Sequence, residues 1–321
     1  MSRLTSCPFI EFSLRAYSAS ERILLRFFCK GRNRNTTLGI NGTLIHSCIH
    51  FGAQPMVARD GHIACAPLGE GAQAIVYRLD RATAVKRFRR AALRSATSPQ
   101  AQQEFLFARR WLTHPHLVRL LDFDLAMGSL AMEYVDGGSL ADVVACEGAL
   151  GEGRVVLALA GVVAGLVVLH EHGLIHRDVK PANVMLDSRT GACKLTDWIG
   201  SQAEDSSLEH GKPVGTPVFM APEVAGRPHQ HRVESDTWAL GCTAVNLASG
   251  RLPWADADAL GRTNEFMAMW LTAQGRPPPY DPSGWSPVLA RFVARCFEPD
   301  PRRRPRAQDL RDDALFAARA D

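Results

Sequence analysis

The sequence lacks a CxxC pair, an internal repeat and any apolar run long enough to cross a bilayer. Its eight cysteines are scattered without regular spacing, which argues against a disulfide framework and favours a reduced intracellular compartment, the cytoplasm. The longest apolar run, Val155 to Leu169, falls short of the roughly 20 residues that a membrane-spanning helix needs. We therefore expect no transmembrane segment, and a buried core helix in that place.

Positive charge is concentrated at the N-terminus, although the net charge of the chain is only +4. Residues 1–60 carry eight Lys/Arg against three acids, a balance of +5, so the remaining 261 residues sum to −1. A nucleic-acid binder usually concentrates positive charge on its folded domain, and this distribution argues against one. Residues 1–61 are basic and contain no long apolar stretch, so we expect a disordered extension, with organelle targeting as the alternative.

Residues 62–317 form one organised unit, followed by a tail at 318–321. Short apolar runs between glycine and polar residues predict strands at 63–68, 75–79, 83–88, 117–121 and 130–134. Helical patterns follow, at 100–112, 139–145, 152–171, 235–250 and 288–297. A small β-rich part followed by a larger helical part predicts an α+β protein of two lobes, 62–135 and 139–317, with a cleft between them.

A glycine turn between the first two predicted strands suits phosphate binding. Gly69 and Gly71 allow backbone N–H groups to approach a polyphosphate without obstruction by a Cβ. The third glycine of a GxGxxG pattern is replaced by Ala74, and two glycines alone are more often just a turn. Lys86 in the third strand adds an ammonium near this turn. Because such a charge in an apolar lobe needs a partner, we expect an ion pair with Glu104 on the next helix.

The strongest cluster of functional groups is the segment His176 to Asn183, directly after the long apolar helix. Phosphoryl transfer needs a group that orients the attacking hydroxyl, cations that neutralise charge and oxygen ligands for magnesium. Asp178, Lys180 and Asn183 suit these three roles in that order. Asp197 follows a short predicted strand pair and offers a second carboxylate for the metal. A solvated polar loop would not explain this order of groups together with Lys86 and Glu104.

Over about 255 residues the sequence resembles the eukaryotic-type serine/threonine protein kinases. Besides the segments above, the resemblance is carried by Gly215-Thr216-Pro217, Met220-Ala221-Pro222-Glu223, Ser235-Asp236-Thr237-Trp238-Ala239-Leu240-Gly241 and Asp300-Pro301 to Arg304-Pro305. It implies the bilobal kinase fold, a buried Glu223–Arg304 ion pair and an Asp236 that braces the catalytic loop. Small-molecule phosphotransferases with a related core share the arrangement of catalytic groups in this loop, but they are not expected to carry the Ala-Pro-Glu segment.

The resemblance implies the role of each site residue. Asp178 would be the catalytic base, Lys180 would contact the γ-phosphate, and Lys86 would pair with the α/β-phosphates and with Glu104. Asn183 and Asp197 would hold Mg²⁺. The backbone of the hinge at 133–135 would bind adenine, with Met132 as the gatekeeper. The residues expected to contact ATP are Leu68, Gly69, Glu70, Gly71, Ala72, Gln73, Ala74, Val76, Ala84, Lys86, Met132, Glu133, Val135, Asp136 and Met185.

The substrates implied by the resemblance are proteins. The pattern His-Arg-Asp-x-Lys with Thr216 is typical of serine/threonine rather than tyrosine kinases. Within the family, Gly215 to Glu223, Leu240 to Thr243 and Ser249 to Trp254 are most similar to the MAP kinase kinase kinase group. Downstream kinases in a signalling cascade are then the expected substrates and partners.

Regulation is expected in the segment between Asp197 and Glu223. Its hydroxyls are candidate phosphorylation sites, and Arg177 would bind the phosphate. The acidic residues of the segment offer an alternative, in which they partly replace a phosphate and the protein is active unmodified. A further alternative is that they only solvate a mobile loop. The candidate regulatory residues are Arg177, Ser201, Ser206, Ser207 and Thr216.

One motif departs from the family. Where an Asp-Phe-Gly sequence is typical, this chain has Asp197-Trp198-Ile199-Gly200. A β-branched residue resists positive φ, so we expect an outward flip of Asp197 to be harder than usual. The small Ala108 would leave room for the larger Trp198. Ala74 and Ile199 are also the only support for the alternative function, a kinase-shaped scaffold that binds partners without turnover.

Overall fold

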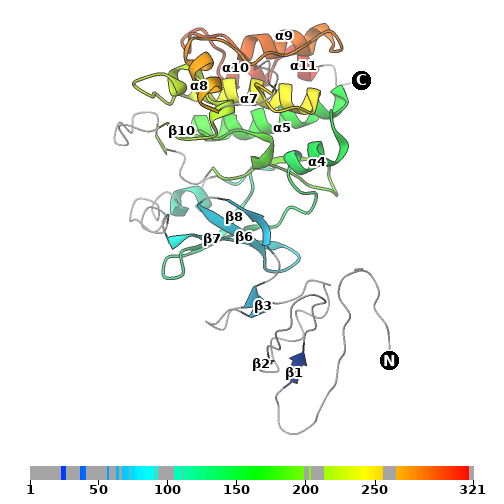
Figure 1. Ribbon diagram of the computed structural model, residues 1–321, viewed down its shortest axis with the longest axis vertical. Coiled ribbons are helices and arrows are strands. Elements are labelled where there is room, and N and C mark those ends of the chain that lie inside the picture. The colour runs from blue at the N-terminus through cyan, green and yellow to red at the C-terminus, as the bar shows by residue number, and fades with distance from the viewer. Residues whose placement is uncertain are drawn as a thin grey trace.

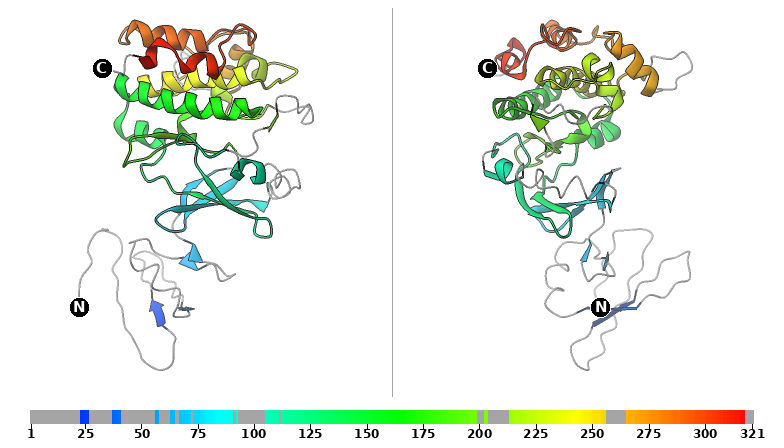
Figure 2. Two further views of the ribbon diagram at one scale, coloured as in Figure 1. Left: turned by 180° about the vertical axis from the view of Figure 1, so that it is seen from behind. Right: turned by 90° about the vertical axis from the view of Figure 1, so that its left-hand side faces the viewer.

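The computed structural model describes residues 23–26, 37–40, 56–57, 63–64, 67–71, 73–90, 92, 105–110, 112–198, 202–203, 213–255 and 265–317. Within 67–317, a β-rich part comes first and a larger helical part follows, and the two stand apart in every view (Figures 1 and 2). The predicted α+β, two-lobed architecture is confirmed. In the predicted N-terminal extension only β1 (Ile23–Arg26), β2 (Thr37–Ile40) and β3 (Met56–Val57) are described, so its disorder or targeting role stays a prediction.

The β-rich part is a five-stranded antiparallel sheet in the order β5-β6-β7-β9-β8. Side chains alternate between the two faces of a strand, so Ala84, Lys86 and Phe88 share one face of β7. The register places Leu130 opposite Lys86 and Met132 opposite Ala84 on β9. This face therefore presents one ammonium among apolar side chains. The strands are β5 (Pro67–Glu70), β6 (Ala74–Arg78), β7 (Thr83–Phe88), β8 (Leu120–Asp124) and β9 (Ser129–Glu133).

One predicted strand is displaced. The strand expected at 117–121 begins instead at Leu120, because the preceding residues pair with a different element. Leu117 forms a parallel bridge to Leu195, and the Val118 amide donates to the Leu195 carbonyl at 2.9 Å. The Leu195 amide in turn donates to the His116 carbonyl at 2.8 Å. Residues 116–118 thus join the sheet to β12 (Cys193–Leu195), which pairs with β11 (Val184–Leu186) and leads to Asp197.

The helical part is built on two long helices that match the predicted ones closely. α5 (Glu152–Glu171) has the expected bounds, and α7 (Val233–Ser249) begins two residues early and ends one residue early. α7 is buried along nearly its whole length and packs against α5 and α9 (Pro287–Cys296). The other helices are α4 (Leu140–Glu147), α6 (Pro222–Ala225), α8 (Glu265–Ala273), α10 (Ala307–Arg311) and α11 (Ala314–Ala317), with 3₁₀ turns η1 (Pro181–Asn183) and η2 (Pro217–Phe219).

By length and hydropathy α5 could span a membrane, but 61% of its most apolar window is buried inside the protein. Two glycines explain how it lies so close to its neighbours. A Cβ on Gly161 would stand 2.8 Å from the Cys193 carbonyl oxygen, and one on Gly165 would stand 2.9 Å from that of His116. Both positions therefore allow backbone segments to pack directly on the helix. α5 is the central helix that supports β12 and the 116–118 segment.

A buried ion pair joins α6 to the segment before α10, as predicted. The Arg304 guanidinium, which has no exposed side-chain surface, donates to both carboxylate oxygens of Glu223, at 2.8 and 3.0 Å. Its remaining hydrogens go to the carbonyls of Glu234, Glu298 and Pro299. Because all donors are satisfied, the buried charge is compensated, and the pair ties α6 and the segment before α10 to the start of α7.

Replacing Glu223 by alanine should destabilise the protein strongly, because it leaves the Arg304 charge buried without its partner. We expect the free energy of unfolding to fall by about 3–5 kcal/mol, as a shift in the midpoint of urea denaturation. Arg154→Ala is the matched control, because Arg154 is paired with Glu147 at the surface and its loss should leave the midpoint nearly unchanged. Equal shifts in the two variants would contradict this account.

Candidate active site

The loop at 176–180 is fixed to α7 by a single buried carboxylate. Asp236, with 1% exposure, accepts hydrogen bonds from the backbone amides of His176 and Arg177, both at 2.8 Å. His170 Nε2 adds a third contact at 2.8 Å. Burial opposes ionisation of Asp236, but hydrogen bonding to His170 and the nearby histidines hold the pKa of its carboxyl below the ordinary value. The predicted bracing role of Asp236 is confirmed.

Arg177 shows what this bracing achieves. Its φ of +71° lies in the left-handed region, which costs energy for a residue with a side chain. Asp236 accepts from the amides of two successive residues, His176 and Arg177, and these two hydrogen bonds hold the backbone in this conformation. His176 then links the loop to the strand segment that carries the metal-ligand candidate: its Nε2 donates to the Thr196 carbonyl at 2.9 Å, while its Nδ1 accepts from the Asp178 amide at 3.3 Å.

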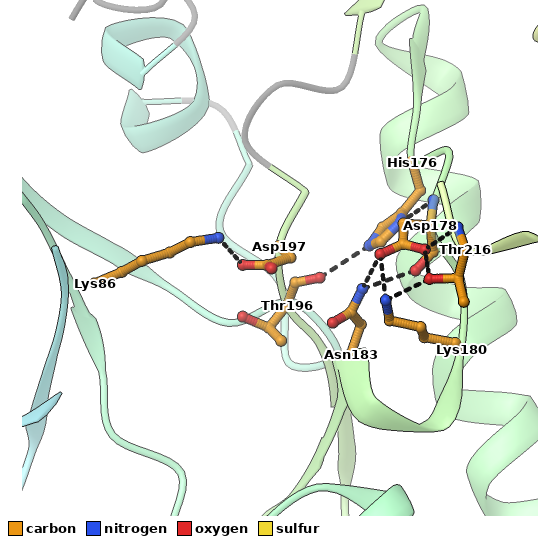
Figure 3. Close-up of polar contacts among 8 residues, drawn as sticks. All are labelled: Lys86, His176, Asp178, Lys180, Asn183, Thr196, Asp197 and Thr216. Atoms are coloured by element: carbon orange, nitrogen blue, oxygen red, sulfur yellow. Dashed lines mark hydrogen bonds and ion pairs between the residues drawn. The ribbon is translucent and has the colours of Figure 1, made fainter. Parts of the chain in front are cut away.

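Asp178 is the centre of a dense polar network (Figure 3). Its Oδ1 accepts from the Thr216 amide at 3.0 Å and the Thr216 hydroxyl at 2.7 Å. Its Oδ2 lies 2.7 Å from Lys180 Nζ and 3.1 Å from Asn183 Nδ2. Burial favours the neutral acid, but the Lys180 ammonium and these hydrogen bonds outweigh it, and the pKa of Asp178 lies below its ordinary value. Asp178 is therefore a carboxylate at neutral pH.

Lys86 and Asp197 meet in the cleft, as Figure 3 shows. Lys86 Nζ donates to Asp197 Oδ1 at 2.6 Å, although 111 residues separate the two. Asp197 adopts a φ of +63° and its side chain is 40% exposed, so its second oxygen remains accessible. Glu104 lies outside the described residues, and its pairing with Lys86 stays a prediction. Direct contacts join Lys86 to Asp197 and Asp178 to Asn183, and their joint action on one nucleotide stays a prediction.

The hinge leaves one backbone donor unused. The Glu133 amide donates to the Arg119 carbonyl at 2.9 Å and the Tyr134 amide to the Ala82 carbonyl at 2.7 Å. The Val135 amide has no hydrogen-bond partner within the described part of the chain. The Glu133 carboxylate points to Lys194 Nζ at 2.6 Å and leaves the backbone of the hinge clear. This arrangement suits a flat heterocycle that needs a donor at residue 135.

The other described residues expected to contact ATP differ in burial. Met132 and Ala84 are buried, Val76 and Met185 are half-buried, and Leu68 is 49% exposed at the edge of the sheet. The Asp136 carboxylate is exposed and accepts from the Ser188 amide at 3.1 Å. Hydrogen bonding to the side chain and then to the backbone of Ser188 lowers the pKa of Asp136. Besides Glu104, four further candidates lie outside the described residues: Ala72, Ser201, Ser206 and Ser207.

The two sequence departures have different outcomes. Trp198 is 2% exposed, its indole N–H donates to the Val118 carbonyl at 3.2 Å, and it belongs to the same core as Ala108. A direct compensation between the two stays a prediction, as does the effect of Ile199, which is not among the described residues. Trp198 borders a small cavity behind the site, lined by Lys86, Phe88, Leu120, Leu130, Met132, Thr196, Asp197 and Trp198.

The donor set fits a Mg²⁺ ion shared with phosphates. Asn183 Nδ2 donates to the Asp178 carbonyl at 2.8 Å, which fixes the amide orientation and leaves Asn183 Oδ1 as a ligand. Asp197 contributes a carboxylate oxygen. No cluster of three or more His, Cys, Asp or Glu side chains suited to a metal occurs within the described ranges. One carboxylate and one carboxamide match the way Mg²⁺ is held by few protein ligands and by substrate phosphates.

Two contacts of the site were not foreseen from the sequence. Thr216 was expected only near the substrate and as a phosphorylation site, yet its hydroxyl lies between Asp178 and Lys180, at 2.7 and 2.6 Å. Arg89 binds the glycine turn, through the Gly71 carbonyl at 3.0 Å and the Glu70 carboxylate. Neither contact has a signal in the sequence, because both depend on how separate segments meet.

Comparison with known proteins agrees with this geometry. Residues 64–316 match the family model described as protein kinase domain. Similar proteins include serine/threonine-protein kinase STE20 of Candida glabrata, 35% identical over 65% of this chain and 22% of that protein. Mitogen-activated protein kinase kinase kinase A of Dictyostelium discoideum is 34% identical over 63% of this chain and 21% of that protein. The human mitogen-activated protein kinase kinase kinase 1 is 31% identical over 68% and 15%.

Asp236→Asn should impair both stability and activity. An amide of the same shape cannot accept from all three donors as the carboxylate does, so a buried amide N–H is left unpaired. We expect a loss of about 2–3 kcal/mol in the free energy of unfolding and a fall in kcat, because Arg177 and Asp178 lose their anchor. Urea denaturation and a phosphorylation assay measure the two effects. Asp122→Asn, at an exposed ion pair, should change neither, and an inert Asp236→Asn would contradict the bracing role.

Proposed function

This chain belongs to the protein kinase domain family, and we propose that it transfers the γ-phosphoryl group of ATP to serine or threonine hydroxyls of proteins. The chain spans about a fifth of the length of the first curated relatives that it matches, so their activity is carried to it as a proposal. The observation that carries the proposal is the network around Asp178, which joins Lys180, Asn183 and Thr216 within 3.1 Å.

Asp178 acts as the base in the proposed reaction. Its carboxylate accepts the proton of the substrate hydroxyl as that oxygen forms a bond to the γ-phosphorus. The bond from the γ-phosphorus to the bridging oxygen breaks, and ADP leaves with that electron pair. Lys180, 2.7 Å from Asp178, neutralises charge on the transferred group. The low pKa of Asp178 keeps the carboxylate ready at neutral pH.

Lys86, Asn183 and Asp197 position the triphosphate. ATP supplies the phosphoryl group, and Mg²⁺ would neutralise the charge of its phosphates. Asn183 Oδ1 and the exposed oxygen of Asp197 would hold the metal. Lys86 now pairs with Asp197 at 2.6 Å and would pair with the phosphates when they bind. The Val135 amide and the Glu133 carbonyl would hold the adenine, beside the gatekeeper Met132.

The substrate class rests on Lys180 and Thr216, with the named relatives as support. STE20 is described as a serine/threonine-protein kinase, and two other relatives as mitogen-activated protein kinase kinase kinases. We therefore propose protein substrates, with kinases of a signalling cascade as the finer choice. A cytoplasmic location is supported by the four described cysteines, which are all free thiols. We also propose that the Arg177 guanidinium binds a phosphate group carried by a side chain of the neighbouring loop.

The scaffold alternative has weaker support. Ala74 is one of the two sequence departures that favour a scaffold. It is buried, begins β6 and pairs with Phe88. Its φ is not positive, so the strand holds alanine there without strain. The contacts of Lys86 with Asp197 and of Asp178 with Lys180 and Asn183 support the transfer reaction instead. A scaffold would need none of the contacts between Asp178, Lys180 and Asn183.

Purified protein incubated with Mg²⁺ and labelled ATP should phosphorylate a serine/threonine peptide library, and Asp178→Asn should reduce the rate by at least about 100-fold. The substitution keeps the shape of the side chain but removes the proton acceptor. Nucleotide binding by the variant, measured by fluorescence titration, should be retained. Equal incorporation by the two proteins would favour the scaffold.

The pH dependence of the reaction should reveal the role of Lys180. In the wild type, the pKa of Asp178 lies below the ordinary aspartate value, so the acid limb of kcat/KM should lie well below neutral pH. Protonation of this group should then leave the activity unchanged near neutrality. Removing the Lys180 cation in Lys180→Met disfavours the carboxylate, so the pKa of Asp178 rises and the acid limb moves to higher pH. Lys180→Arg keeps the cation and should keep the limb low. A limb that does not move in Lys180→Met would contradict this role.

A further inference from the structure

The glycine turn between β5 and β6 is anchored by one residue at the end of β7. The backbone amide of Arg89 donates to the Gln73 carbonyl at 2.7 Å. Its Nε donates to the Gly71 carbonyl at 3.0 Å, and its Nη2 pairs with the Glu70 carboxylate. The residue thus binds the turn at Glu70, Gly71 and Gln73. Among the described residues of the turn, one further backbone bond runs from the Gly71 amide to the Ala74 carbonyl at 2.9 Å.

Packing does not hold this turn. All four residues of β5 are exposed, and β5 is the edge strand of the sheet. A Cβ on Gly69 would meet nothing within 4 Å, and one on Gly71 would meet only the Ala74 carbonyl oxygen at 3.7 Å. The conformation of the turn therefore depends on its hydrogen bonds. A bound carbonyl fixes the plane of its peptide unit, so the Arg89 contact sets the orientation of the Gly71 carbonyl.

The same contact also changes the charge of the turn. Glu70 carries a negative charge that would face a polyanion if the turn covers phosphates. The Arg89 guanidinium pairs with the Glu70 carboxylate and offsets this charge. A planar guanidinium with several donors can bind a carbonyl and a carboxylate at once, which a lysine ammonium does less well.

We propose that Arg89 is a positioning residue for ATP: it presets the glycine turn in the conformation that receives the triphosphate and neutralises Glu70. The inference rests on the proposed function, because it takes the turn as the phosphate-binding element. Arg89 acts through the backbone of the turn and not by touching the nucleotide. Its effect should therefore appear in the affinity for ATP and not in the chemical step.

Arg89→Ala should raise KM for ATP and the Kd of a fluorescent ATP analogue about tenfold, which is the effect of losing a charge-assisted hydrogen bond. With saturating ATP, kcat and KM for the protein substrate should stay within about twofold of the wild type, because the network around Asp178 is untouched. Arg89→Lys should fall between the two. Glu70→Gln in the Arg89→Ala background should recover part of the affinity, because it removes the unpaired negative charge.

Arg90→Ala is the matched control. Arg90 is the next residue, is exposed, and makes no ion pair or hydrogen bond through its side chain with other described residues. It should bind ATP as the wild type does. Equal losses in the two variants would show a general effect of surface charge and overturn the inference, and so would an Arg89→Ala variant with wild-type KM and Kd for ATP.

The test separates this inference from the proposed function. If the wild type and Asp178→Asn transfer phosphate equally while Arg89→Ala still weakens nucleotide binding, the proposed function fails and the role of Arg89 stands. If the wild type turns over and Arg89→Ala is unchanged, the inference alone fails. The thermal unfolding midpoint should be equal in Arg89→Ala and Arg90→Ala, which excludes a loss of fold as the cause.

Discussion

The buried carboxylate of Asp236 is the interaction on which the site depends. Removing a charge from water is costly unless hydrogen bonds replace the lost solvation, and here His170, His176 and Arg177 supply them. The carboxylate is carried by α7, which is buried along nearly its whole length and is therefore fixed in place. By binding the amides of His176 and Arg177, the carboxylate holds Arg177 in its left-handed conformation. The conformation of Arg177 in turn sets the position of the next residue, Asp178.

A few contacts connect the loop that Asp236 holds to the β-rich part of the protein. His176 binds the Thr196 carbonyl, and the next residue, Asp197, meets Lys86 from β7. Close by, Lys194 of β12 pairs with Glu133 of β9, and Leu195 bonds to the 116–118 segment. These contacts are made by β12 and by the two residues that follow it, Thr196 and Asp197. The two parts of the protein are thus joined where the hinge, the metal-ligand candidate and the catalytic loop meet.

The sequence predicts the helical scaffold better than the cleft contacts, for physical reasons. The bounds of α5 follow from a long apolar pattern whose burial is local to the helix. The strand expected at 117–121 was displaced to Leu120–Asp124 because Leu117 pairs with β12, which no local pattern records. The roles given to Asp178, Asn183 and Asp197 came from residue type and order. The contacts of Arg89 and Thr216 depend on tertiary approach, and their residue types alone carry no signal.

Two departures from the family pattern, Ala74 and Trp198, are accommodated in the described part of the structure without strain. Ala74 sits where a strand needs no glycine, so the loss of the third glycine removes freedom from the turn without straining it. The backbone at Gly69 and Gly71 keeps its conformational freedom, and the contacts of Arg89 with Glu70 and Gly71 restrict it. Trp198 stays in the core with its indole N–H bonded to the Val118 carbonyl, which ties the residue after Asp197 to the segment beside β12. A larger aromatic with a polar partner thereby helps to hold the Asp197 carboxylate in the cleft. Neither Ala74 nor Trp198 displaces a group that phosphoryl transfer requires, so neither of them favours the scaffold alternative.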